Sequence, residues 1–345
     1  MSWFHDLPVW MSLPSPSGFE TRLKDALKAR WEEAGLSVHQ DALGNLWVHR
    51  GPEDAAVHWM VVAPLDEPGL VVTHVEEATG LARVVPLNPE QGPFHRVPAP
   101  VRTIEGQPGA LRWEPGPLPS EPRWEQVVLE LWEGRPYRGQ ILHWDTPGAL
   151  HPEDEPRVLT GRGLHRSLAV LLGEMARTFH PQQVRVTFLL AVREQVSTRG
   201  AVLAASTLAP QAVLYLKTVP AQEPKGPQDL PTPGQGPVLV IREPGWTAHP
   251  AMVNWLETHV LTTYQRAILP TGSRTAHEIP FVAPGGLAFA VLGLTCRGWQ
   301  TPYEALALAD LAALQEGLHR TLHALDEAPP TLAPKAQGSA PAPAT

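Results

Sequence analysis

The 345-residue chain contains a single cysteine, Cys296. A disulfide framework needs pairs of cysteines and a thiolate metal site needs several, so neither can form within one chain. We expect Cys296 to be buried as a small apolar side chain, because no Cys/His arrangement for a nucleophile accompanies it. This cysteine usage is typical of a reducing compartment, and we predict a cytoplasmic protein.

An excess of positive charge is also lacking. The chain has 27 Lys and Arg against 35 Asp and Glu, a net charge of −8. Surfaces that bind nucleic acids are basic, so we predict no nucleic-acid partner. No apolar run approaches the roughly 18–20 residues of a membrane-spanning helix, and residues 1–6 lack the features of a secretory signal. We therefore expect no membrane segment.

Two common catalytic signatures are missing. The sequence has neither a Gly-x-Ser-x-Gly nucleophile motif nor a phosphate-binding loop. The 15 histidines are scattered, and the closest pair, His319 and His323, is spaced four residues apart on a predicted helix. The main interpretation is that both are ordinary surface side chains, and metal binding by the pair is a minor alternative.

What the sequence does contain is an alternation of buried strands and helices, which predicts an α/β sheet flanked by helices. The predicted strands include residues 58–63, 188–192, 212–216, 238–241 and 287–294. The predicted helices cover about 17–33, 164–176, 200–206, 249–264 and 302–325. For the first helix, Ser17 and Glu20 have the spacing of a capping box.

The segment 71–158 differs, because short alternating pieces are separated by turns rich in Pro and Gly. It predicts a small β-domain inserted into the α/β domain. We therefore expect a discontinuous α/β domain over 1–70 and 159–326 and an inserted domain over 71–158. Residues 327–345, rich in Pro and Ala, should form a disordered tail.

Acidic residues follow two of the buried strands. Asp66 comes after the strand at 58–63, and Glu194 comes after the strand that contains Phe188. Because the carboxyl ends of parallel strands meet at one edge of a sheet, this edge is the candidate site.

Several segments resemble the tetrahedral (TET) glutamyl or deblocking metallo-aminopeptidases, a family once labelled endoglucanases. They are Ser15–Glu20, Asp41–Leu46, Asp66–Leu70 with Val72–Val75, Gly161–Leu164, Arg199–Ala201, His249-Pro250, Ile268–Pro270 and Arg297. The resemblance implies a zinc-peptidase-like mixed sheet flanked by helices, with a β-barrel-like insert used for dimerisation and assembly. It also implies two divalent metal ions, such as zinc or cobalt, held by five side chains, and a glutamate as general base.

The five family ligand positions are all changed in this chain. They correspond to Pro64, His165, Gln195, Lys217 and Gln300. Two further family positions keep their acids, namely Asp66, which orients a ligand in the family, and Glu194, which matches the general base. A further segment, Gly272–Ala276, lacks the acid of its family counterpart. If this correspondence holds, all these residues converge on one site.

Our leading hypothesis is a pseudoenzyme without metal cofactors, in which Asp66 and Glu194 persist as structural carboxylates. Lys217 would then stand where a metal stood and offset the repulsion between them. The protein would be a homo-oligomer, or a hetero-oligomer with an active paralogue, and could bind a peptide. The alternative is an active aminopeptidase-like hydrolase with a rearranged or metal-free site, using Glu194 as base, Lys217 as electrostatic stabiliser, and His165 as a relocated ligand.

Overall fold

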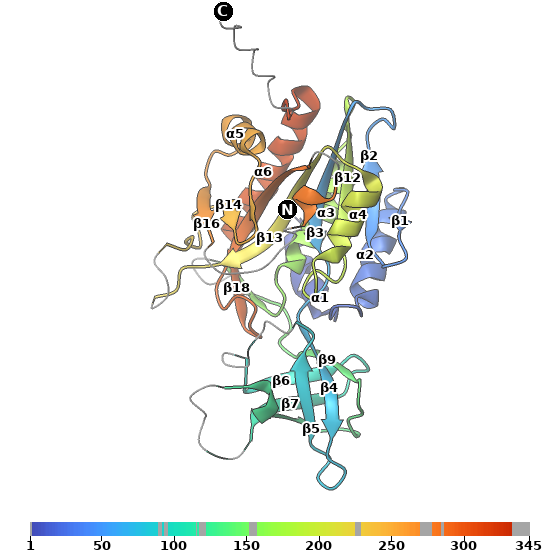
Figure 1. Cartoon of the computed structure of the whole chain (residues 1–345), viewed down its shortest axis with the longest axis vertical. Coiled ribbons are helices and arrows are strands. Elements are labelled where there is room, and N and C mark those ends of the chain that lie inside the picture. Colours follow the sequence, from blue (N-terminus) through green and yellow to red (C-terminus); the bar gives the residue numbers. More distant parts are fainter. Residues whose placement is uncertain are drawn as a thin grey trace, which may run out of the picture.

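A computed structural model describes residues 2–88, 92, 96–114, 116, 122–151, 157–224, 229–269, 278–283 and 286–332. Figure 1 shows an elongated molecule, with a helix-flanked sheet at one end and a small barrel at the other. The predicted segment Gly272–Ala276, Pro270 and the tail beyond Leu332 lie outside the described residues.

The helices that flank the sheet come from both halves of the chain. They are α1 (Leu7–Ser12), α2 (Thr21–Glu33), α3 (Arg166–Thr178), α4 (Arg199–Leu208), α5 (Pro250–His259) and α6 (Leu308–Glu327). Short 3-10 turns are η1 (Ser2–Asp6), η2 (Trp124–Gln126), which lies between two strands of the insert, and η3 (Ile279–Phe281). None of the helices in the described part of the chain combines the length and hydropathy that a membrane crossing requires.

The main sheet has nine strands in the order β1-β2-β12-β3-β13-β17-β14-β15, with β16 also paired to β14. Strands β12, β3, β13 and β17 are parallel, whereas β2 and β14 run antiparallel to their neighbours in this core. The strands are β1 (His39–Gln40), β2 (Leu46–Arg50), β3 (Val57–Pro64), β12 (Val184–Ala191), β13 (Ala212–Pro220), β14 (Val238–Glu243), β15 (Trp246–Thr247), β16 (Gln265–Ile268) and β17 (Ala288–Cys296).

Both faces of this sheet are covered, which explains its continuous apolar strands. Because side chains alternate along a strand, Val61 and Ala63 of β3 face a core shared with α2, α3, α5 and α6. Met60 and Val62 face the opposite core, to which α4 contributes Ala201. The mixed α/β sheet predicted from the sequence is confirmed.

The insert closes into a six-stranded barrel with its own apolar core. Its strands pair in the order β4-β5-β8-β7-β6-β9: β4 (Gly69–Val75), β5 (Ala82–Pro86), β6 (Ala99–Thr103), β7 (Pro108–Trp113), β8 (Val127–Leu131) and β9 (Ile141–Trp144). The chain then returns through β10 (Ala149–His151) and β11 (Val158–Gly161), and β11 pairs with β18 (Glu304–Ala307). The predicted inserted barrel is thus confirmed.

Two predicted helix starts are wrong. The capping box at Ser17 does not form, because the Ser17 hydroxyl donates to the Asp66 carboxylate, and α2 begins only at Thr21. The helix expected from Pro302 begins at Leu308, because Glu304–Ala307 is strand β18, paired with β11. Local apolar patterns do not reveal such pairing with a distant strand.

Candidate functional site

The candidate site lies where the parallel strands β3 and β12 end. Pro64 ends β3 opposite Ala191 of β12, and the next residue, Leu65, donates its backbone N–H to the Ala191 carbonyl at 2.8 Å. The segments that follow β3 and β12 therefore leave the sheet side by side. This register places Asp66 beside Glu194, although 128 residues separate them in sequence.

Asp66 is the centre of this site and is fully buried. Its carboxylate accepts the backbone N–H groups of Glu194 at 3.0 Å and Gln195 at 2.8 Å, and the hydroxyl of Ser17. Burial, followed by the nearby carboxylate of Glu20, raises the pKa of Asp66 well above its ordinary value. Asp66 thus fixes the loop that follows β12 by bonding to its backbone.

Glu194 is buried and its carboxylate also has protein partners. It accepts the Ala201 N–H, at the start of α4, at 2.8 Å and the Tyr215 hydroxyl at 2.7 Å. Burial raises the pKa of Glu194 to about 7, against the lowering effect of these hydrogen bonds. Sequence reasoning missed Tyr215, although its position two residues before Lys217 puts both side chains on one face of β13.

The loop between β12 and α4 has an unusual backbone. Arg193 (φ 59°) and Thr198 (φ 53°), on either side of Glu194, adopt the left-handed conformation that non-glycine residues rarely use. Asn45 holds the two ends of this loop, because its side chain accepts the Val192 N–H and donates to the Gly200 carbonyl, both at 3.0 Å. The Asp41–Leu46 segment singled out in the sequence therefore supports the site.

His165 and Gln195, two of the predicted ligand positions, lie together here. His165 directly precedes α3 and its Nε2–H donates to the Asp66 carbonyl oxygen. The Gln195 amide nitrogen lies 3.4 Å from the same His165 nitrogen. Burial lowers the pKa of His165 to about 4, so its imidazole is neutral at pH 7.

Lys217 does not make the contact that we expected. Its ammonium forms a buried ion pair with Glu243 of β14, and the Trp246 indole N–H donates to the other oxygen of Glu243 at 3.2 Å. Among the described residues, neither the Asp66 nor the Glu194 carboxylate contacts Lys217. Because Glu243 neutralises it in the low-dielectric interior, Lys217 is not the direct counter-charge of the two retained acids.

Gln300 approaches the site through its backbone. Its N–H donates to the Glu304 carboxylate at 2.7 Å, and the other oxygen of Glu304 accepts the Leu164 N–H at 2.7 Å. Burial raises the pKa of Glu304 to about 7. Glu304 thus links Gln300 to the start of α3. This link was not predicted, because the sequence pattern placed Glu304 in a helix.

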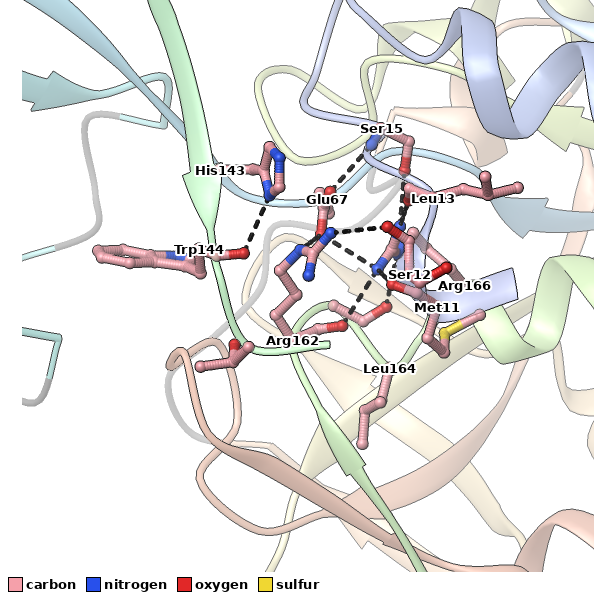
Figure 2. Close-up of polar contacts among 12 residues, drawn as sticks. Met11, Ser12, Leu13, Ser15, Glu67, His143, Trp144, Arg162, Leu164 and Arg166 are labelled. Carbon is pink, nitrogen blue, oxygen red and sulfur yellow. Dashed lines mark hydrogen bonds and ion pairs between the residues drawn. The ribbon is translucent and has the colours of Figure 1, made fainter. Parts of the chain in front are cut away.

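A second buried cluster adjoins the site and was not predicted. Figure 2 shows Glu67 between the guanidinium groups of Arg162 and Arg166. Glu67 lies 2.9 Å from Arg162 and 3.1 Å from Arg166, and all three side chains are at most 2% exposed. Although burial opposes it, the two arginines hold the pKa of Glu67 below its ordinary value.

Arg166 extends this cluster to the N-terminal segment. Its guanidinium donates to the backbone carbonyls of Met11 at 3.0 Å and Leu13 at 2.6 Å, and to the Ser15 hydroxyl at 3.1 Å (Figure 2). Arg166 is the first residue of α3 and directly follows His165. The Arg166 side chain therefore connects α1, the turn after β3 and the start of α3.

The side chains at the five predicted ligand positions do not fit a dinuclear metal centre. Divalent metals bind carboxylate, imidazole or thiolate donors, whereas Pro64 offers no donor and Lys217 is a paired cation. The His165 Nε2–H is engaged by the Asp66 carbonyl. Within the part of the chain that the structure describes, no group of three or more His, Cys, Asp or Glu side chains is placed to hold a metal.

Comparison with known proteins identifies the relatives of the chain. Residues 165–316 match the profile of the M42 glutamyl aminopeptidase family. A glutamyl aminopeptidase from Lactococcus lactis is 26% identical over 323 residues, covering 86% of this chain and 89% of the relative. The predicted resemblance is thereby confirmed.

Solved structures show the same fold. An aminopeptidase from Desulfurococcus kamchatkensis superposes with a TM-score of 0.82 at 21% identity, covering 93% of this chain and 94% of the other. The Pyrococcus horikoshii TET1 peptidase, described as assembling into a tetrahedron or a large octahedral shell, gives 0.78 at 18% identity, covering 92% and 98%.

Proposed function

Because the chain is a relative of the M42 glutamyl aminopeptidases, we propose that it is a non-catalytic member of that fold with a structural, regulatory or peptide-binding role. The observation that carries this proposal is the bonding of the site. Asp66 and Glu194, the retained acids, are satisfied by backbone N–H groups and hydroxyls, and Lys217 is paired with Glu243.

Electrostatics supports the loss of the metals. Binding two divalent ions requires ligand carboxylates to offset four positive charges, and this chain has His165, Gln195 and Lys217 at the three positions that we match to ligand carboxylates. Lys217, whose ammonium is paired with Glu243, offers no lone pair to a metal ion. Burial instead raises the pKa of Asp66 well above its ordinary value and that of Glu194 to about 7, so this site disfavours concentrated negative charge.

Assembly is the part of the family's character that we propose this chain retains. The Pyrococcus relative is described as assembling into a tetrahedron or a large octahedral shell, and 92% of this chain superposes on it. The barrel forms one end of this molecule (Figure 1). We propose a homo-oligomer, or a hetero-oligomer with an active paralogue, in the cytoplasm. Its mass in solution, measured by light scattering alone and with a co-expressed paralogue, distinguishes the two.

The catalytic part of the proposal is tested by peptide hydrolysis. The purified protein should release no amine from a panel of aminoacyl anilides, including glutamyl, whether zinc, cobalt or manganese is added or a chelator is present. The Lactococcus lactis glutamyl aminopeptidase, assayed in parallel, is the positive control. Metal-dependent turnover by this chain at a rate comparable to that control would contradict the proposal.

The second candidate function is an active hydrolase with a rearranged or metal-free site. The observation that favours it is the pKa of about 7 for Glu194, the range in which a carboxyl can serve as a general base. Chelator-resistant hydrolysis that the Glu194→Gln substitution abolishes would support this function. Absence of hydrolysis in both the wild type and the variant supports the non-catalytic proposal.

A further inference from the structure

The exposed face of α6 carries two histidines one helical turn apart, away from the candidate site. His319 and His323 are both exposed, and their ring centroids lie 4.4 Å apart with an interplanar angle of 43°. Residues spaced by four project from the same side of a helix. We propose that this pair chelates one borderline divalent metal ion of the Zn²⁺, Ni²⁺ or Cu²⁺ class.

Burial of the opposite face of α6 sets the direction of this pair. Leu311, Leu314, Leu318, Leu322 and Leu325 are buried in the core beneath the helix. The helix therefore cannot rotate without exposing them, and the histidine face stays toward solvent. The two imidazoles are thus held on one side of a rigid element, which lowers the ordering cost of chelation.

The two rings are available to a ligand. The two imidazole rings contact each other, and the ring of His323 also makes an edge contact with the Phe179 ring at a centroid distance of 5.8 Å. In the described chain neither imidazole has a hydrogen-bond or ion-pair partner that would compete for its nitrogens. The Phe179 contact also restricts the ring of His323, so less side-chain freedom is lost on binding.

Charge around the pair does not oppose a cation. Arg320, between the two histidines in sequence, is ion-paired with Glu316 at 3.2 Å and donates to the Val260 carbonyl at 3.0 Å. Glu327 follows His323 by one further helical turn and is exposed. The local cation is therefore neutralised, and acidic side chains lie at both ends of the histidine face.

The ligand set defines the metal class. Imidazole nitrogen suits Zn²⁺, Ni²⁺ and Cu²⁺, whereas Mg²⁺ and Ca²⁺ require oxygen donors. Because the described residues provide no third ligand of the His, Cys, Asp or Glu type at this pair, water completes the coordination. With only two protein ligands, such a site exchanges its metal with solution.

The proposal is tested by titrating the metal-free full-length protein with NiCl₂ and with ZnCl₂. The heat of binding is measured by titration calorimetry, and the melting temperature is measured with and without metal. The wild type should bind with an affinity at least about tenfold higher than His319→Ala or His323→Ala, because two linked ligands act together. The doubly substituted His319→Ala/His323→Ala protein should lose this binding event. His5→Ala, which removes another exposed histidine, should leave it unchanged.

A spacing variant separates chelation from the mere number of histidines. His323→Ala/Glu327→His keeps two exposed histidines on α6 but places them about 12 Å apart along its axis, too far to share one ion. Single-histidine affinity in this variant supports the proposal. Wild-type affinity in it, or in the His319→Ala/His323→Ala protein, overturns the proposal.

Discussion

Glu194 and Asp66 show how much a residue's position in a motif reveals and what it leaves out. The ends of two buried strands were enough to place these acids at one edge, and the family resemblance added His165 and Gln195 to the same site. Their actual partners could not be predicted, because Tyr215 and Ser17 come from distant segments whose register only the folded sheet defines. The same reason explains the wrong partner expected for Lys217.

The raised pKa of Glu194 makes stability depend on pH. The Glu194 carboxyl binds its proton more tightly in the folded protein than in the unfolded chain. The stabilisation from this proton is therefore present below pH 4.5 and is lost as the pH rises through about 7. The loss amounts to roughly 3 kcal/mol. In urea unfolding between pH 5 and 8, Glu194→Gln should gain stability relative to wild type as the pH rises. A constant difference between the two proteins would refute this assignment.

Lys217 is expected to matter through Glu243. Lys217→Met should cost about 3–5 kcal/mol in free energy of unfolding, because it removes one member of a buried ion pair. The double variant Lys217→Met/Glu243→Gln should recover much of that loss. Both values come from chemical denaturation, and a double variant no more stable than Lys217→Met would count against the pairing.

At the scale of elements, the part of the sheet formed by β2, β12 and β3 contains the histidines His49 and His58. The Trp47 indole N–H donates to His49 Nε2 at 3.2 Å, so His49 Nδ1–H donates to the Thr187 hydroxyl at 2.8 Å. The same hydroxyl oxygen lies 2.7 Å from His58 Nε2. This chain of bonds ties β2 and β3 to β12 between them.

Acid should weaken this part of the sheet. Burial, with the nearby charge of Arg185, lowers the pKa of both His49 and His58 to about 4. Their stabilising contribution is therefore present above pH 6.5 and is lost as the pH falls toward 4. The double variant His49→Asn/His58→Asn should show a flatter decline of melting temperature over this range. An equally steep decline would show that other groups control it.

The elements themselves were largely predictable, and their ends were not. Continuous apolar runs gave β3, β12, β13 and β17, because a strand covered on both faces needs apolar residues throughout. The start of α6 was missed, since β18 is only four residues long and depends on pairing with β11. Such a short strand has no distinct pattern of its own.

At the scale of the whole molecule, Glu67 and its two arginines lie where the chain leaves the sheet for the barrel and where it returns. Glu67 precedes β4, and Arg162 follows β11 (Figure 2). Glu67→Gln should cost about 3–5 kcal/mol, because it leaves two buried guanidinium groups without their anion. Calorimetry checks this, with the exposed ion-pair variant Glu114→Gln as the control, for which a loss below about 1 kcal/mol is expected. Equal losses in both variants would contradict a special role of the cluster.

We propose that the edge around Asp66 and Glu194 holds no dinuclear metal centre, and the metal content of the protein decides this. The measurement is elemental analysis of protein produced with added zinc, cobalt and manganese, in the His319→Ala/His323→Ala background so that the α6 pair does not contribute. We predict far less than one bound ion per chain after gel filtration. About two ions per chain would show that the dinuclear metal centre is present.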